Sequence, residues 1–308
     1  MISSYTVGIY PRSEELIEAT RKNSKNLSSF YLREKKEYIA IQKKAKLGYV
    51  CDPLLDWDDI YRPFSKLKSV KLAALNRIYE TNTFYRRLSF DGPLDDAGNI
   101  VKSSLAISLL PKNRTVCLAD PYTIADVHLS AKYTKREEFT LAIAKMLRKE
   151  IDTLVKSGFE LVQLVAPSVA YNEKVDFGIV KNGLEIITRG LKAKTILHFY
   201  FGDVSKKIEK LLDMPVSGLG FDTMLTPISS IKKHNFSGKS LAVGIVNSYN
   251  TKLEDKQDCI TELNSIISKT KPDKAFVTTS FDLQYLPKDF AVRKILRLGE
   301  IARGVRSA

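Results

Sequence analysis

Cysteine, histidine and tryptophan are scarce in this chain: its 308 residues include three cysteines, three histidines and one tryptophan. Three widely spaced cysteines without a Cys-x-x-Cys pair exclude a disulfide framework and indicate a reducing compartment. No apolar run approaches the roughly 20 residues that cross a bilayer. The N-terminus lacks the basic start and long apolar stretch of a secretory signal, so we expect no such signal. We therefore expect a cytoplasmic protein with no membrane partner.

Acidic residues are outnumbered by basic ones, 35 to 49, so the formal net charge is +14. Such a surplus suits an anionic partner, and it equally suits a solvated, lysine-rich surface. The lysines are scattered, and the densest cluster, at 33–46, is typical of one helix face with interspersed glutamate. Because no nucleic-acid-binding motif accompanies the charge, we interpret it as surface and expect no nucleic-acid partner.

Short β-branched runs alternate with longer helical patterns along the chain. The expected strands lie at 5–10, 48–51, 115–119, 161–165, 195–201, 218–221, 241–246 and 275–279. The expected helices lie at 11–46, 135–157, 177–191, 204–212, 229–233, 255–270 and 289–305. Eight strand–helix units with nearly continuous apolar strands predict an α/β fold, a (β/α)8 TIM barrel with an N-terminal helical segment.

Residues 53–113 depart from this repeat. Their pattern predicts a helix at 72–79 and a β-hairpin formed by 84–90 and 100–110, with glycine and proline turn signals between them. We expect a single domain over 1–308 with this excursion at about 53–113. An open doubly wound sheet is the main alternative, but GxGxxG and Walker-type phosphate loops are both absent.

Several segments near the expected strand ends follow one another in a recognisable order. They are Gly8-Ile9-Tyr10-Pro11-Arg12, Ala119-Asp120-Pro121-Tyr122-Thr123, Glu150 with the strand at 161–165, His198 with Gly202-Asp203, and Ser280-Phe281-Asp282-Leu283. Each segment alone is a weak signal. In their order and spacing they resemble the barrels of the cobalamin-independent methionine synthase family, in the superfamily that includes uroporphyrinogen decarboxylase. The resemblance runs through the whole chain.

The resemblance implies an activity and a metal. The family transfers a methyl group to the sulfur of homocysteine, and a zinc ion held by one His, two Cys and one Glu lowers the thiol pKa. His198 stands at the zinc histidine, whereas Tyr200 and Phe281 stand at the two cysteines. Where another loop of the family carries an Asp-Glu pair, this chain has Val165-Ala166. Of the family's early acidic segment, Asp52 is the one acidic residue that remains here. Aromatic rings cannot replace thiolates on zinc.

The resemblance therefore implies a zinc-free barrel, like the N-terminal barrel of the family's two-barrel enzymes, standing alone as in archaeal split versions. We expect an accessory subunit that assists methyl transfer to homocysteine by a zinc-bearing catalytic chain, with a pterin or another methyl donor. No cofactor is expected in this chain. Two alternatives stay open: a self-sufficient methyltransferase or decarboxylase-like enzyme with a remodelled site, and a ligand-binding scaffold.

Individual site residues carry two interpretations each. The candidate catalytic residues are Asp120, Tyr122, His198, Asp203 and Asp282, and the candidate ligand-binding residues are Arg12, Trp57 and Thr123. The acids can equally cap loops, Trp57 can pack at a domain edge, Arg12 can form a salt bridge at a helix start, and His198 can bond a neighbour such as Asp222. Cys51 and Cys117 are weak metal candidates together with His198, against a role in the core. We expect His128 and His234 at the surface.

Overall fold

Eight parallel strands form one sheet that is almost closed into a barrel. The computed structural model describes residues 2–81 and 83–305. The strands are β1 (Ile2–Tyr5), β2 (Val50–Cys51), β5 (Arg114–Ala119), β6 (Phe159–Val165), β7 (Lys194–Phe199), β8 (Gly218–Asp222), β9 (Ser240–Val246) and β10 (Lys274–Thr279). Their order is β1-β10-β9-β8-β7-β6-β5-β2. The two end strands are linked where the Tyr49 N–H donates to the Ser4 carbonyl at 2.9 Å, so the predicted TIM barrel is confirmed.

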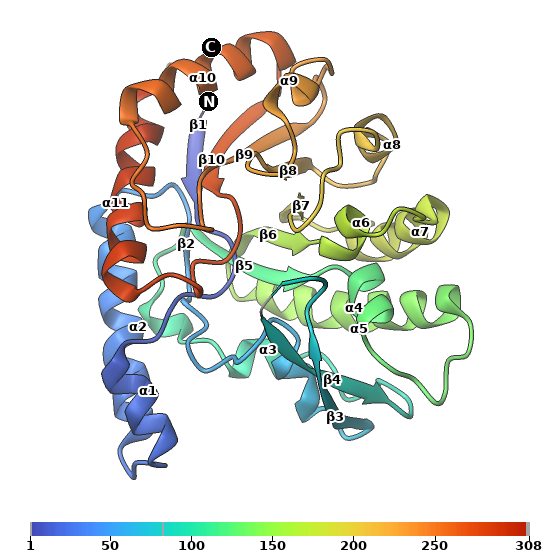
Figure 1. Cartoon of the computed structure of the whole chain (residues 1–308). Helices are drawn as coiled ribbons and strands as arrows, with labels where there is room; N and C mark the ends of the chain where they lie inside the picture. The colour runs from blue at the N-terminus through green and yellow to red at the C-terminus, as the bar shows by residue number, and fades with distance from the viewer. Residues whose placement is uncertain (1, 82, 306–308) are drawn as a thin grey trace.

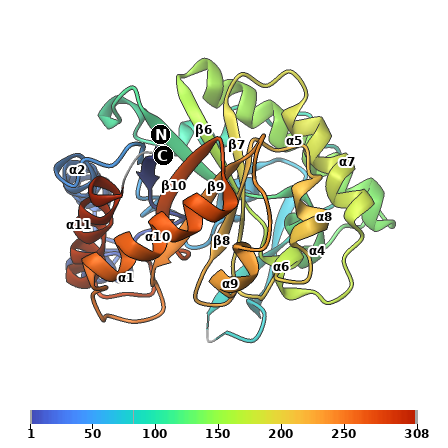
Figure 2. The same cartoon turned by 90° about the horizontal axis from the view of Figure 1, so that it is seen from above.

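The strands are buried on both faces, which explains their continuous apolar runs. Every residue of β8 and β9 is buried, and β6 and β7 each expose only one residue. A parallel barrel needs this pattern because side chains fill its interior and helices cover its outside. Figure 2, the view from above, shows the outer helices lying around the sheet.

Helices follow most strands, as the alternation predicted. The helices are α1 (Glu14–Arg21), α2 (Leu27–Lys44), α3 (Ile100–Ser103), α4 (Pro121–Val127), α5 (Arg136–Lys156), α6 (Pro167–Tyr171), α7 (Phe177–Thr188), α8 (Ile208–Leu212), α9 (Ile228–Ile231), α10 (Lys256–Thr270) and α11 (Lys288–Gly304). On α5 the buried side chains include Phe139, Ile143, Leu147 and Leu154, the spacing of one apolar helix face. No helix in the described part of the chain is long and apolar enough to cross a membrane.

The excursion between β2 and β5 folds differently from its prediction. The segment expected as a helix at 72–79 is strand β3 (Val70–Arg77), which pairs antiparallel with β4 (Phe84–Phe90). Its leucine and alanine content favours a helix, but pairing with β4 overrides that weak local preference. The expected strand at 100–110 is wrong as well, because this stretch forms α3 and a 3-10 turn at Ile107–Leu109. Figure 1 shows the β3–β4 ribbon projecting from the barrel.

Smaller differences concern the ends of elements. The first strand is Ile2–Tyr5 and shares only Tyr5 with the strand expected at 5–10, and after it Gly8 has a positive φ of 66°, which a strand does not adopt. The helix expected over 11–46 is divided into α1 and α2, and α8 begins at Ile208 rather than Val204. The short helices α4 and α6 were not predicted. Each begins with a proline directly after a strand, a position that proline tolerates well.

Candidate functional site

The carboxyl ends of the strands and the loops that follow them form the barrel mouth, the usual place of a TIM-barrel active site. The structure brings Asp120, His198 and Asp282 to this end, directly after β5, on β7 and in the loop after β10. All three side chains are buried. Three of the predicted site residues therefore lie buried at this end of the barrel, and a catalytic role for them stays a prediction.

His198 lies inside the barrel, and its surroundings determine the tautomer and the charge of its ring. Its Nε2 lies 2.9 Å from the Ser280 carbonyl oxygen, so Nε2 carries the proton, and Nδ1 has no hydrogen-bond partner in the described structure. The partner is thus Ser280, not Asp222 as expected. Burial lowers the pKa of His198 to about 4, which keeps the ring neutral at physiological pH. Gly220 on β8 makes room for the ring, since a Cβ there would lie 2.3 Å from Nδ1.

Aromatic rings fill the space beside His198. The ring centroid of Tyr200 lies 6.2 Å from that of His198 and 5.8 Å from that of Phe281. Phe201 and Tyr249 pack on Phe281 at 5.1 Å and 4.4 Å. The two positions that the resemblance aligns with zinc cysteines therefore hold packed aromatic rings.

The remaining donors do not fit a zinc site. Burial raises the pKa of Cys51 to about 11 and that of Cys117 above its usual range, so both stay protonated thiols. The Sγ of Cys51 contacts Thr6 and Gln42 at 3.4 Å and 3.6 Å. Within residues 2–81 and 83–305, no group of three His, Cys, Asp or Glu side chains is arranged to hold a metal. Cys51, Cys117 and His198 form no such group among these residues, so a remodelled metal site at them stays a prediction.

Asp120 and Thr123 hold the loop at the end of β5. The carboxylate of Asp120 caps α4 by accepting the Tyr122 and Thr123 N–H groups at 2.9 and 3.3 Å. The Thr123 hydroxyl accepts the Ser168 N–H at 3.3 Å. Burial raises the pKa of Asp120 to about 7. The hydrogen bonds of Asp120 and Thr123 thus fix the conformation of this loop. Whether Tyr122 contacts a ligand stays a prediction.

Three further candidates lie away from His198. Arg12 donates to the Leu55 carbonyl and to Asp58, 2.9 Å away, so its guanidinium is occupied by a salt bridge. Trp57 is buried, and its Nε1 donates to the Ser104 hydroxyl, which leaves no exposed face for stacking. Asp203 is exposed and accepts from Ser205.

Asp52 belongs to a buried ion pair instead of a substrate site. Its carboxylate lies 3.4 Å from the Nζ of Lys35 and accepts the N–H groups of Leu54 and Ala106, both at 2.8 Å. The lysine also reaches Asp56 at 2.8 Å. Asp52 therefore connects the excursion to α2 through its contacts with Ala106 and Lys35.

His128 is buried, so the expected surface position is wrong. Its Nδ1 accepts the Leu88 N–H at 3.1 Å, and Tyr61 packs edge-on against its ring at 4.6 Å. Burial lowers its pKa to about 3. His234 is half-buried. The burial of His128 follows from the excursion, whose strand β4 covers it, and no local sequence signal reports such a contact.

Two hollows open at the barrel mouth. A cavity of about 230 Å³, named here the mouth cavity, lies between the excursion and the ends of β7 and β10. Its aromatic walls are Tyr61, Phe84, Tyr85, Tyr200, Phe201 and Tyr285. Its acidic lining is Asp58, Asp59 and Asp282. A larger hollow of about 1260 Å³, the side groove, lies beside α6, α7 and α8 and is lined by Asp203 and several lysines.

Asp282 gives a pH prediction. Burial raises its pKa from 3.8 to about 7, so the folded chain keeps a proton that the unfolded chain releases above pH 4. Folding stability is therefore lost as the pH rises from about 4 to about 7. Asp282→Asn removes this dependence, and we expect the variant to gain about 2–4 kcal/mol relative to the parent between pH 5 and pH 8. Urea unfolding of both proteins at the two pH values measures it.

The matched control for this prediction is Asp203→Asn, which changes an exposed carboxylate in the loop after β7. Its unfolding free energy relative to the parent should differ little between pH 5 and pH 8. Other buried acids, including Asp120 and Asp222, titrate identically in both proteins and cancel in the comparison. A pH-independent difference between Asp282→Asn and its parent would contradict the assignment.

Comparisons with known proteins agree with this architecture. The model of the cobalamin-independent synthase N-terminal domain family matches residues 102–271, more than half of the chain. A methionine synthase of Saccharolobus solfataricus is 23% identical over 99% of this chain and 95% of its own length. One of Sulfolobus acidocaldarius is 22% identical over 97% and 90%. Among solved structures, a B12-independent methionine synthase from a Shewanella species superposes with a TM-score of 0.75 at 17% identity, covering 98% of this chain and 96% of that one.

Proposed function

This chain belongs to the cobalamin-independent methionine synthase family, and from that premise we propose that it is an accessory barrel in methyl transfer to homocysteine. In this proposal a separate, zinc-bearing chain of the family binds the metal and activates the thiol, with a pterin or another methyl donor. Both chains would work in the cytoplasm, where three free cysteines are stable.

One observation carries the proposal: the rings of Tyr200 and Phe281 pack beside a neutral, buried His198. Thiol activation needs a cation next to sulfur, because the thiolate is the nucleophile. The His198 ring has its Nε2 proton committed to Ser280, and its Nδ1 is enclosed by β8. Among the described residues, the lining of the mouth cavity thus offers no cation to hold a thiolate, which favours a partner that supplies one.

The decarboxylase-like alternative is less well supported. A polycarboxylate substrate needs cationic side chains around it. In the described structure, no lysine or arginine lines the mouth cavity, whereas three carboxylates do. A scaffold that only binds a ligand is compatible with the residues of the mouth. Reconstitution separates it from the accessory role.

Reconstitution tests the proposal directly. The full chain is purified, its zinc content is measured, and methyl transfer to homocysteine is assayed alone and after addition of a zinc-bearing family member from the same genome. We expect substoichiometric zinc, no turnover alone, and faster turnover of the partner when this chain is present. Stoichiometric zinc with turnover by the chain alone would contradict the accessory role, and an unchanged partner rate would leave the scaffold as the better reading.

His198→Ala gives a residue-level prediction. Under the accessory role, His198 is a positioning residue in the barrel interior, so turnover of the reconstituted pair should fall by less than about threefold. A loss of about 100-fold or more, the scale of a missing acid–base group, would place a working site in this chain. His198→Gln, which keeps a donor for the Ser280 carbonyl, is the control that separates local unfolding from lost chemistry.

A further inference from the structure

The lining of the mouth cavity is opposite in character to the chain as a whole. Six aromatic side chains and three carboxylates surround about 230 Å³, and in the described structure none of the 49 lysines and arginines lines it. In a protein of net charge +14, an acidic, aromatic hollow at the functional end of the barrel needs an explanation. Packing alone does not require carboxylates there, because burying them is costly.

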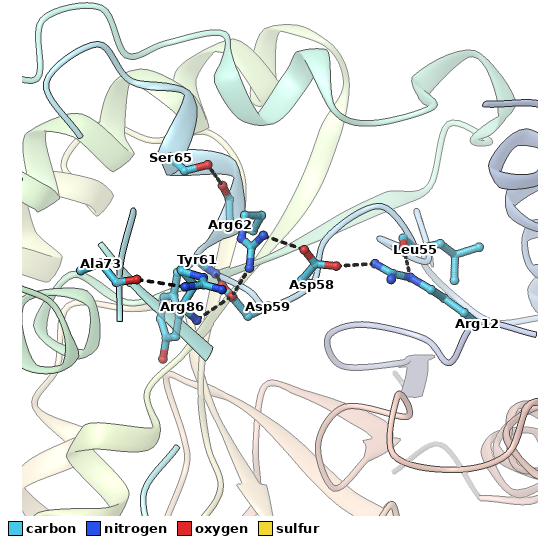
Figure 3. A network of polar contacts seen from close by, with 9 residues as sticks. All are labelled: Arg12, Leu55, Asp58, Asp59, Tyr61, Arg62, Ser65, Ala73 and Arg86. Carbon is cyan, nitrogen blue, oxygen red and sulfur yellow. Dashed lines mark hydrogen bonds and ion pairs between the residues drawn. The ribbon is translucent and has the colours of Figure 1, made fainter. Parts of the chain in front are cut away.

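Two of the three carboxylates already have cationic partners. Asp58 bridges Arg12 at 2.9 Å and Arg62 at 2.6 Å, and Asp59 lies 3.3 Å from Arg62. Figure 3 shows this chain of contacts running from Arg12 through Asp58 and Arg62 to Asp59 and Arg86.

Asp282 is the carboxylate without a cation. Its Oδ1 accepts the Ile9 N–H at 3.1 Å, and its Oδ2 receives only the side-chain amide of Gln284 at 3.3 Å. No salt bridge to Asp282 occurs among the described residues. The loop after β10 therefore presents one uncompensated acidic group to the cavity.

The walls around Asp282 provide aromatic surfaces in several orientations. Tyr200 and Phe201 meet edge to face with ring centroids 4.7 Å apart, and Tyr61 meets Tyr85 in the same way at 5.5 Å. Tyr285 covers the outer side and is 41% exposed. The hydroxyl of Tyr61 is buried and has no hydrogen-bond partner in the described structure, and in Figure 3 it points away from the arginine network.

We propose that the mouth cavity binds a small methylated ammonium ion, with its charge against Asp282 and its methyl groups against the tyrosine and phenylalanine rings. Aromatic cages attract such cations through the negative faces of the rings, and a carboxylate adds direct charge pairing. An anion would face the acidic group unfavourably. A bare metal ion would find one carboxylate without a cation and otherwise tyrosine hydroxyls, fewer charged oxygens than Ca²⁺ or Mg²⁺ usually takes. This inference does not depend on the proposed accessory role.

Calorimetric titration of the full chain with tetramethylammonium chloride at pH 8 tests the proposal. We expect a single site with a dissociation constant of about 1 mM or tighter, and at least about tenfold weaker binding of neopentyl alcohol, an uncharged molecule of similar size. Equal affinity for both probes, or no binding of tetramethylammonium at about 20 mM, would overturn the proposal.

Variants locate the site. Asp282→Asn, which the pH argument expects to be more stable than the parent at pH 8, should weaken tetramethylammonium binding at least about tenfold. Tyr285→Leu should weaken it as well, whereas Tyr285→Phe should keep most of it because the ring remains. The control Asp203→Asn, in the side groove, should bind like the parent. Undiminished binding by both Asp282→Asn and Tyr285→Leu would place the ion elsewhere and refute the assignment.

Discussion

Lys294→Met is expected to lower the free energy of unfolding by about 3–5 kcal/mol, the cost of removing one partner from a buried ion pair. Lys294 on α11 is completely buried. Its Nζ lies 2.7 Å from the Glu254 carboxylate and donates to the Lys252 carbonyl at the same distance. Without the lysine, a nearly buried carboxylate would remain without a cation. Urea unfolding at pH 7 measures the loss.

Two controls make this prediction specific. Adding Glu254→Gln to Lys294→Met removes the orphaned charge, so the double variant should recover part of the lost stability. Lys232→Met breaks the more exposed pair with Glu262, which is 2.6 Å long, and should cost about 1 kcal/mol or less. A loss below about 1 kcal/mol for Lys294→Met would show that the carboxylate is solvated or neutral.

Glu150→Ala should cost about 3 kcal/mol or more, because one carboxylate satisfies three backbone donors of the excursion. Glu150 on α5 is completely buried and accepts from the N–H groups of Gly98, Ile100 at 3.2 Å and Val101 at 3.0 Å. Alanine would leave these donors unpaired. Urea unfolding gives the cost, and hydrogen exchange should show faster exchange at 98–101 than in the parent.

The conservative variant Glu150→Gln separates hydrogen bonding from packing. It keeps one acceptor oxygen, so it should lose clearly less stability than Glu150→Ala. Glu160→Ala, which removes an exposed side chain from β6, is the surface control and should stay within about 0.5 kcal/mol of the parent. Similar losses for Glu150→Ala and Glu150→Gln would mean that the three N–H groups find water.

The barrel repeat was predictable because its strands and helices carry their signals locally. The run Leu241–Val246 is apolar at nearly every position, and α5 shows its buried face in its spacing. The excursion was not predictable in the same way. Leu72, Ala73, Ala74 and Leu75 are helix formers by composition, and only the antiparallel partner 84–90 makes them a strand. A contact between distant segments decides such a case, and single-sequence patterns do not contain it.

The candidate site shows the same division. The order of motifs placed His198, Tyr200 and Phe281 at the barrel mouth, and the structure packs them together. Trp57 is a candidate ligand platform by its sequence, but it is buried and its Nε1 donates to Ser104, 47 residues along the chain, a contact that no local pattern reports. Tyr61 and Tyr85 were overlooked for the converse reason. They reach the mouth only because the excursion folds back over it.

The way in which the sheet closes limits how early the barrel can form during synthesis of the protein. Strand β1 pairs with β10, so Ser4 meets Val277 across more than 270 residues, and Figures 1 and 2 show β1 beside β10. On a ribosome, β5 to β9 are synthesised as successive neighbours and can associate as they emerge. The first strand has to wait for residues 274–279, so the barrel becomes a closed ring only after β10 has been made.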